Sequence, residues 1–459
     1  MRNRRKKSSG SKIIIVLMFI FLAAGAGYIY TSPEFERVAP QIEAKNSYLW
    51  NKKTPVKITL SDNIGLKSFQ LILSDGKNRV IVGEGAFKKG TRKQTLLVRY
   101  PQGRILDPKA KKLKLKISTA DQSKWNTFQG NRSEKIIDLQ IDDRRPGVEV
   151  VANSYSITQG GSALVVFRAS DENLDKVYIE TAAKKFKVQP YKRKGYYAAL
   201  IAWPFTQKVF SAKAVAEDSA GNSHSKHIPF YPKKHDYKVS WIPLSDKFID
   251  GKIRDLASAD QQYEHIDKRM ERLRAVNETM RLNNEDMIHK LSSNLSKDLL
   301  TQWSIVKFYP LKNGAKVASY GDERHYYYGD KSNEVSHSYH VGYDLASTKM
   351  ATIRSSNPGK VVFASYNGIY GNMPMIDHGL GLYTLYGHCS EMMVKEGDRV
   401  KAGDAIAKTG TSGLALGDHL HFGVLVQGIE VRPVEWFDGS WIKKNIDDIF
   451  TQADKVIQK

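Results

Sequence analysis

The chain has 459 residues, with 71 Lys and Arg against 48 Asp and Glu, which gives a formal net charge of +23 at pH 7. This length predicts about three domains. The single cysteine, Cys389, excludes an intramolecular disulfide, so each domain must be held together by its own core.

The beginning of the chain predicts a membrane segment. Residues 13–30 are uncharged and almost wholly apolar, and a helix of that length at ~1.5 Å per residue spans about 27 Å, just enough to cross a bilayer. The residues before it include only basic charges, at Arg2, Arg4, Arg5, Lys6, Lys7 and Lys12. The positive-inside rule therefore keeps residues 1–12 in the cytoplasm. We expect a single-pass anchor in the cytoplasmic (inner) membrane, with the bulk of the chain in the periplasm or another extracytoplasmic space.

A cleaved signal peptide is the alternative interpretation of this segment. Ala23–Gly27 offers small residues to a signal peptidase. The apolar run is longer than a typical signal core, which favours an uncleaved anchor.

The strong positive charge points to anionic partners. An exported chain meets little nucleic acid, so we expect no nucleic-acid partner, and anionic wall polymers and membrane headgroups fit better. Part of the charge has a simpler explanation. Lysines alternate with apolar residues across residues 109–117, a pattern that is typical of a strand with one solvated face.

Two β-sandwich modules are expected next. Short runs of alternating apolar and polar residues, separated by turn signals, continue to about residue 232. Pro40–Ala44 resembles Pro146–Val150, about 106 residues further on, which is the size of an immunoglobulin-like domain. We therefore predict immunoglobulin-like modules over residues 38–143 and 144–235. They would act as spacers, as wall-binding modules, as docking surfaces for cell-wall proteins or as a cover over the catalytic groove.

Residues 251–300 predict helix instead. Apolar residues recur there at helical intervals among many charges, which indicates one long or two shorter amphipathic helices. Asn283-Asn284 is the expected break. A helical hairpin that packs on the neighbouring domains is the simpler interpretation, and an arm that regulates, dimerises or recruits a partner is the alternative.

The last third of the chain contains the motifs that carry chemistry. They are His340-Val341-Gly342-Tyr343-Asp344, Tyr386-Gly387-His388 and His419-Leu420-His421. Four histidines and one aspartate are what a mononuclear zinc hydrolase needs: three ligands, an open fourth position, and two imidazoles left to handle protons. His419 and His421 lie two apart in an expected strand and so face one side. Because Gly342 separates His340 from Asp344, we expect a loop that runs into a strand there.

These motifs resemble those of the LytM/lysostaphin-type zinc metallopeptidases, which cut the peptide part of peptidoglycan. The resemblance covers roughly residues 302–440 and includes Gly410–Val424. It implies an antiparallel β domain with lipoyl-barrel-like hairpins, in a chain that is mainly β overall. Loops 325–338 and 366–374 would wall a narrow groove for an extended peptide, and residues 441–459 would form a C-terminal tail.

The resemblance also implies a role for each motif residue. His340, Asp344 and His421 would bind one Zn²⁺, while His388 and His419 would activate water and stabilise the oxyanion. Cys389 departs from the usual apolar residue after the histidine, with no expected consequence for zinc. His337 is expected to be an exposed loop histidine, because only His340 has an aspartate four residues later.

The implied activity is hydrolysis of amide bonds in peptidoglycan peptide stems or cross-links during wall remodelling, shape control or septation. In a Gram-negative cell this means a D,D-endopeptidase, with carboxypeptidase activity as an extension. Glycyl-glycine cleavage is the alternative enzyme activity. A non-hydrolytic scaffold that activates other wall hydrolases is the alternative from another class, and it would need no zinc.

Overall fold

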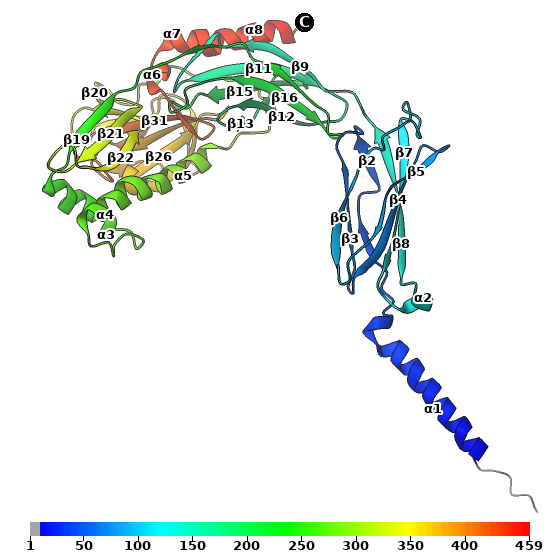
Figure 1. Cartoon of the computed structure of the whole chain (residues 1–459). Coiled ribbons are helices and arrows are strands. Elements are labelled where there is room, and N and C mark those ends of the chain that lie inside the picture. The colour runs from blue at the N-terminus through cyan, green and yellow to red at the C-terminus, as the bar shows by residue number, and fades with distance from the viewer. Residues whose placement is uncertain (1–9) are drawn as a thin grey trace, which may run out of the picture. The chain divides into compact units, whose positions relative to one another are not determined.

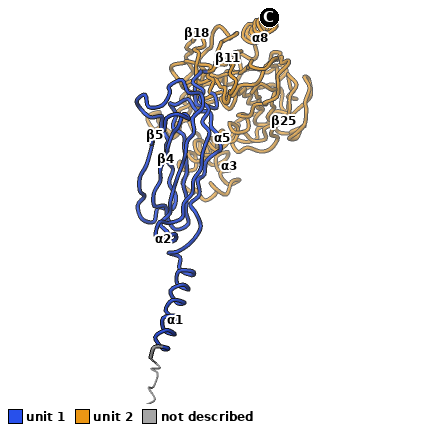
Figure 2. Tube along the Cα trace, turned by 90° about the vertical axis from the view of Figure 1, so that its right-hand side faces the viewer, with its two compact units in different colours: residues 1–145, 218–222 blue, residues 146–217, 223–459 orange. Residues whose placement is uncertain are grey.

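The computed structural model describes residues 10–459, and the chain divides into two compact units. The first comprises Met1–Arg145 with Asp218–Asn222, and the second comprises Pro146–Glu217 with Ser223–Lys459 (Figure 2). All the histidine motifs lie in the second unit. Most of the expected cytoplasmic tail, residues 1–9, lies outside the described residues.

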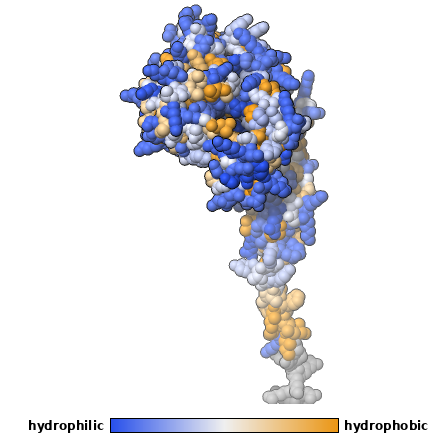
Figure 3. All heavy atoms as spheres, turned by 90° about the vertical axis from the view of Figure 1, so that its left-hand side faces the viewer, coloured by the Kyte–Doolittle hydropathy of each residue, from blue (hydrophilic) through white to orange (hydrophobic). Residues whose placement is uncertain are grey.

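The apolar segment forms helix α1, Gly10–Thr31. Its stretch Lys12–Thr31 is long and apolar enough to cross a membrane, and residues 12–31 are all exposed, as the hydrophobic colouring of this helix shows (Figure 3). A helix that is apolar all round and lacks a protein partner is suited to lipid. The finding fits both a membrane anchor and a signal segment.

The rest of the first unit is a two-sheet β structure (Figure 1). One sheet has the order β1-β3-β6 and the other β2-β8-β7-β4-β5. The bounds are β1 Gln41–Glu43, β2 Ser47–Trp50, β3 Val56–Ser61, β4 Leu66–Ser74, β5 Arg79–Ala86, β6 Lys93–Val98, β7 Lys112–Asp121 and β8 Arg132–Ile141, with a short helix α2, Trp125–Phe128. Alternate residues of β7 are buried, so the lysine-rich strand does place its apolar side in the core. The immunoglobulin-like topology stays a prediction.

The second unit begins with two four-stranded sheets. Their orders are β14-β15-β11-β9 and β13-β12-β16-β17, and β10 pairs with β18 beside them. The bounds are β9 Gly147–Asn153, β10 Ser156–Thr158, β11 Ser162–Ser170, β12 Leu174–Thr181, β13 Lys185–Phe186, β14 Gln189–Pro190, β15 Tyr196–Ala202, β16 Ala212–Asp218, β17 Ser223–His227 and β18 Tyr231–Lys233. Strand β11 is almost fully buried because it lies between two neighbours inside the core.

The helical segment follows, and its break differs from the expected one. Its elements are η2 Phe248–Ile253, α3 Arg254–Ser258, α4 Arg269–Arg274, η3 Ala275–Met280 and α5 Arg281–Ser292. The prediction of a break at Asn283-Asn284 is wrong, since both residues lie inside α5 and helix runs without interruption over residues 269–292. The break comes earlier, at residues 259–268. The long helix packs in one core with the sheet that carries the histidines (Figure 1).

Asp344, Gly387 and His421 lie on a large antiparallel sheet of order β20-β23-β31-β27-β26-β25-β29, with β32 beside β31. The bounds are β20 Ala315–Ala318, β23 Tyr343–Ala346, β25 Gly359–Tyr366, β26 Asn372–Asp377, β27 Leu382–Gly387, β29 Arg399–Val400, β31 Leu420–Val426 and β32 Ile429–Val431. A smaller sheet has β24 Thr352–Arg354, β30 Ala405–Lys408 and β28 Glu391–Met392, and η4 is Gly368–Tyr370. The expected mainly β architecture is confirmed.

A further sheet of this unit, β19-β21-β22, carries His340 at the end of its strand β22. Its strands are β19 Val239–Pro243, β21 Asp322–Tyr327 and β22 Glu334–His340. The expected loop at residues 325–338 is therefore wrong, because most of it belongs to the β21–β22 hairpin. The chain ends in α6 Pro433–Trp436, α7 Gly439–Ile442, η5 Lys443–Asp447 and α8 Asp448–Ile457. Residues of α8 join the core of β9 and β11, so the expected tail is packed helix.

Candidate metal centre

Three strands bring His340, Asp344 and His421 together. His340 is the last residue of β22, Asp344 lies in β23, and His421 lies in β31. Asp344 and His421 are direct partners in the antiparallel β23–β31 ladder. The expected loop that runs into a strand is confirmed at residues 341–342, which lead into β23, but His340 itself still pairs with Asp322 of β21. A strand end fixes an imidazole more firmly than a loop, because the backbone is held by the ladder.

The three side chains converge on one point. His340 Nε2 lies 3.0 Å from Asp344 Oδ1 and 3.1 Å from His421 Nδ1. His421 Nδ1 lies 2.9 Å from the same Asp344 oxygen. All three residues are buried. Ligands about 2.0–2.2 Å from a tetrahedral zinc stand roughly 3.3 Å apart, so this spacing fits the ion.

The hydrogen bonds around His340 also favour a cation. Its Nδ1 faces the carbonyl oxygen of Ser319 at 2.8 Å, so Nδ1 must carry a hydrogen. In the neutral ring, Nε2 then presents a lone pair to the Asp344 carboxylate, and two acceptors repel each other. A bound cation between them removes that conflict. A backbone carbonyl behind the ligating imidazole is the usual arrangement at metal sites.

The charge states of the group suit metal ligation. Burial lowers the pKa of His421 to about 4, so the ring is neutral at pH 7. Burial opposes ionisation of Asp344, yet the adjacent His340 and His421 outweigh it and hold the pKa of this carboxyl well below its usual range. A metal needs neutral imidazole and ionised carboxylate as ligands.

His388 and His419 flank this group without joining it. The His388 ring centroid lies 4.8 Å from that of His419 and 5.8 Å from that of His421. His388 Nδ1 donates to Ser412 O at 2.8 Å and His419 Nδ1 donates to Gly417 O at 2.7 Å. Because each Nδ1 hydrogen is held by a carbonyl, Nε2 is the nitrogen that each ring can use for proton exchange. His419 Nε2 lies 3.6 Å from Asp344 Oδ2.

His388 is held in an unusual conformation. Its φ is +64°, a left-handed backbone value that residues other than glycine rarely adopt. Backbone strain of this kind is common at functional sites. Burial, with His421 and His419 adding to it, keeps the pKa of His388 well below its usual range. The neighbouring Cys389 is buried, which raises the pKa of its thiol to about 12. That cysteine is therefore an inert packing residue at neutral pH.

Two glycines of the motifs allow close approach at the centre. A Cβ at Gly342 would stand 2.3 Å from His421 Nε2, so no larger residue fits between His340 and Asp344 without moving that ring. Gly413 has φ +68°, and a Cβ there would stand 2.3 Å from the Gly371 nitrogen. These contacts explain why glycine occupies these two positions of the motifs.

The centre lies at the bottom of an open groove of about 740 Å³. The hairpin β21–β22 lines one part, through Asp322, Arg324 and Tyr326. Segments ahead of residue 302 line another part: residues 238–245 around β19, and Leu273, Asn277 and Arg281 of the long helix. No local pattern in the sequence indicates these wall residues, apart from the apolar periodicity of the helix.

A second group of side chains with metal-ligand atoms, which no sequence motif indicates, lies on the same hairpin. Glu323, His325 and His337 offer ligand atoms within 4.8 Å of one another. His337 is not the loop residue expected, because it lies in β22 directly opposite His325 of β21. Glu323 and His325 lie two apart in β21 and so share a face, but His337 is twelve residues beyond His325, and only the register of the hairpin brings it to them.

Comparison with known proteins places this centre in a family. Residues 338–433 match the model of Peptidase family M23. The DD-carboxypeptidase/endopeptidase Mpg of Neisseria meningitidis is 35% identical over 109 residues, which cover 23% of this chain and 25% of that protein. The peptidoglycan DD-endopeptidase ShyB of Vibrio cholerae is 38% identical over 96 residues, 21% and 22% of the two chains.

Among solved structures, the catalytic domain of lysostaphin from Staphylococcus simulans is similar at 28% identity and a TM-score of 0.23, covering 27% of this chain and 92% of that one. This chain spans about a quarter of the length of the curated relatives named above. Residues 338–433 are thus a Peptidase family M23 domain. M23 peptidases are zinc metallopeptidases, and the buried His340–Asp344–His421 group has the donor atoms and spacing for that ion.

Proposed function

We propose that this protein is a zinc metallopeptidase that hydrolyses amide bonds in the peptide cross-links of peptidoglycan, as a D,D-endopeptidase. The observation that carries the proposal is the buried group of His340, Asp344 and His421 with His388 and His419 beside it, at the bottom of an open groove. The relatives named for DD-endopeptidase and DD-carboxypeptidase activity support the choice of substrate.

His340, Asp344 and His421 are the proposed zinc ligands. When bound, zinc acts as a Lewis acid that polarises the scissile carbonyl and makes water a better nucleophile at neutral pH. The protein supplies the geometry. Ladder pairing fixes Asp344 opposite His421, and the Ser319 carbonyl fixes the tautomer of His340.

His388 and His419 are the proposed proton carriers and oxyanion donors. Each ring turns Nε2 toward the site, because its Nδ1 hydrogen is held by a backbone carbonyl. A neutral imidazole takes the proton of the attacking water at Nε2, and the resulting N–H then donates to the oxyanion or to the leaving amine. Proton transfer of this kind contributes about 10²–10⁴-fold to the rate.

The groove is suited to an extended, charged peptide. Its wall includes the cationic side chains of Lys238, Arg281 and Arg324. Arg281 is held in place by its own helix, through bonds to the carbonyl and amide oxygens of Asn277. A guanidinium fixed in this way binds a carboxylate with two parallel bonds, and peptidoglycan peptides carry free carboxylates. We propose Arg281 as a substrate-binding residue.

The membrane part of the proposal rests on α1. Residues 13–30 would anchor the chain in the cytoplasmic membrane, with the peptidase on the outer side of it. The apolar and fully exposed Lys12–Thr31 stretch supports this placement, and so do the wall-directed activities that the relatives' names state. The two β modules of residues 38–143 and 144–235 and the helical segment remain proposed contact surfaces for cell-wall proteins.

The test is digestion of purified cross-linked muropeptides by the full chain in detergent, read by mass spectrometry. It is run with zinc, with a chelator, and with His388→Ala, and His227→Ala serves as an exposed histidine control on β17. Loss of cross-linked dimers that requires both zinc and His388 is the expected result. Product masses separate cleavage within cross-links from carboxypeptidase trimming and from glycyl-glycine cleavage.

The scaffold alternative makes the opposite prediction. A chain that binds zinc yet leaves every muropeptide intact would support a non-hydrolytic activator. The convergence of all five motif residues disfavours it, since a scaffold does not need two further histidines beside three buried ligands.

A further inference from the structure

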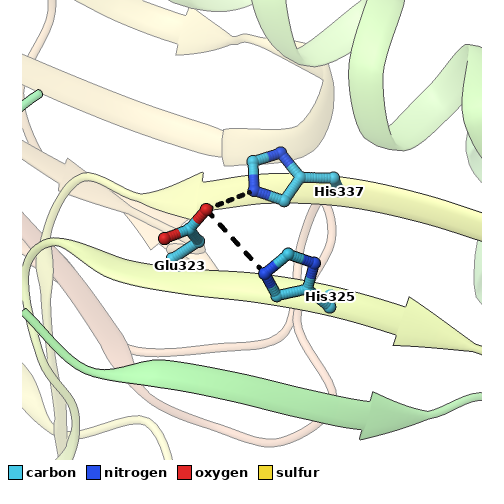
Figure 4. Close-up of side chains that lie close together, drawn as sticks. All are labelled: Glu323, His325 and His337. Atoms are coloured by element: carbon cyan, nitrogen blue, oxygen red, sulfur yellow. Dashed lines mark hydrogen bonds and ion pairs between the residues drawn. The ribbon is translucent and has the colours of Figure 1, made fainter. Parts of the chain in front are cut away.

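The hairpin β21–β22 has two chemically distinct faces. Neighbouring residues of a strand point to opposite sides, so His340 and its partner Asp322 face the groove, while Glu323, His325 and His337 face away from it. Figure 4 shows these last three side chains close together, with one Glu323 oxygen turned toward both rings. This second group belongs to no part of the proposed catalytic site.

The donor atoms of the second group lie at distances typical of shared coordination. Glu323 Oε1 lies 3.1 Å from His337 Nε2 and 3.8 Å from His325 Nε2 (Figure 4). Two imidazole nitrogens and one carboxylate oxygen are a common three-ligand set for zinc and other divalent transition metals, with a fourth position left for water. The hairpin register fixes this spacing, because His325 and His337 are direct cross-strand partners.

The groups around His325 hold its ring in the way that outer-shell partners hold a metal-binding imidazole. Its Nδ1 lies 2.8 Å from Glu334 Oε1, so the hydrogen is held on that side and Nε2 is turned toward Glu323. The Trp241 ring of β19 stacks on the imidazole, with 4.6 Å between centroids and 15° between planes. The ligand carboxylate is held too, since Tyr339 donates to Glu323 Oε1 at 3.3 Å.

The charges of the cluster also fit a dication. Glu323 and Glu334 supply two negative charges around two imidazoles. Among the described residues, Lys331 lies over the Trp241 ring, 4.8 Å from the indole centroid, and forms no ion pair with Glu323. The three ligand side chains are partly exposed, so an ion reaches them directly from solvent.

We propose that Glu323, His325 and His337 form a second binding site for a divalent transition-metal ion, on the outer face of the hairpin that carries His340. The site holds one ion through Glu323 Oε1, His325 Nε2 and His337 Nε2, with Glu334 orienting His325. An ion there joins β21 to β22 three residues before His340, and so braces the strand that presents a catalytic ligand.

The test counts zinc on the full chain in detergent, produced without a polyhistidine tag, stripped with a chelator and then dialysed against buffered micromolar zinc. The wild-type chain is expected to hold two ions, as measured by plasma mass spectrometry, and His337→Ala one. His421→Ala, which removes a ligand of the buried centre, is expected to retain one. The double variant should hold none, and His227→Ala should hold two.

A second variant and a second probe guard against misfolding. Glu323→Gln keeps the side-chain shape and should lower zinc binding as His337→Ala does, with an unchanged circular dichroism spectrum. Cobalt added to the His421→Ala chain should give visible absorption bands that vanish when His337 is also replaced. If His421→Ala binds neither zinc nor cobalt, the outer site does not exist, whereas an inactive wild-type chain with two zinc ions would count only against the proposed peptidase function.

Discussion

Two groups of histidine and carboxylate side chains occupy opposite faces of one hairpin and its neighbours, and they differ chiefly in burial. The side chains of His340, Asp344 and His421 are 5%, 10% and 7% exposed. Those of His325, Glu323 and His337 are 20%, 34% and 37% exposed. The donor types are the same, so the surroundings must decide what each group does.

Burial gives the inner group its chemistry. Out of water, a carboxylate and two imidazoles are fixed in one arrangement, and their interactions with an ion are stronger in the lower dielectric. The outer group keeps contact with solvent, which favours exchange of an ion over catalysis at it. The types of ligand atom indicate a metal site, while the burial of those ligands indicates whether the site serves catalysis or ion exchange.

The sharpest way to break the inner group alone is Gly342→Ala. The added Cβ would stand 2.3 Å from His421 Nε2 and push the ring off the ion. We expect muropeptide hydrolysis to fall by about 10³-fold or more, since several kcal/mol of Lewis-acid stabilisation are lost. Bound zinc should drop by one ion per chain.

The matched control for this variant is Gly251→Ala, where a Cβ meets nothing within 4 Å. It should keep both activity and zinc. Full activity in Gly342→Ala would show that His421 is not held by the close approach of this backbone.

The effect of burial on histidine charge is testable away from both metal groups, at His378. Burial lowers its pKa to about 4, from an ordinary value near 6.5. Between pH 6.5 and 4, His378 therefore binds a proton in the unfolded chain but stays unprotonated in the folded chain. The free energy of unfolding should fall over that range as the pH is lowered, by up to about 3 kcal/mol from this residue.

Denaturant midpoints at pH 7 and pH 4.5, both in chelator, measure this dependence. His378→Gln should reduce the difference between the two midpoints relative to wild type, and the exposed His227→Gln should leave it unchanged. An equal difference between the two midpoints in all three chains would mean that the pKa of His378 is not lowered in the folded chain.

The smallest expected effect is the order in which the two ions leave. Stepwise addition of chelator should remove the outer zinc first, at concentrations about tenfold or more below those that remove the inner one. Burial and fixed ligands make the inner ion bind more tightly and dissociate more slowly. Hydrolysis should persist until the inner ion leaves. Loss of activity with the first ion would show that the outer site is needed for catalysis.

Local pattern was enough to find the inner group. His340 and Asp344 lie within five residues, and His419 and His421 alternate along one strand, so short-range geometry already places each pair on one side. Alternating residues likewise predicted the mainly β architecture. The strand end at His340 was missed, because Gly342 looks like the start of a loop and only the pairing with Asp322 extends the ladder.

Tertiary contacts overrode local propensity in the helical segment. Asn283 and Asn284 are poor helix formers, which made them the expected break. In the fold, Asn283 donates to the Tyr263 hydroxyl and Asn284 accepts from the Ile369 backbone, so both side chains are satisfied within α5. Packing of this helix beside the sheet also places Asn277 and Arg281 on the groove wall, a role that no spacing in the sequence indicates.

Local sequence was enough to identify the donor atoms, the pairs His340–Asp344 and His419–His421, and the apolar stretch near the beginning of the chain. These features depend on neighbours a few residues apart, where strand and helix periodicity settle the geometry. The tertiary structure alone decided that Asp344 lies opposite His421, that His325 lies opposite His337, and that the helix at residues 269–292 lines the groove. Such placements depend on strand register and packing between distant segments, because those long-range contacts set which side chains share one small volume.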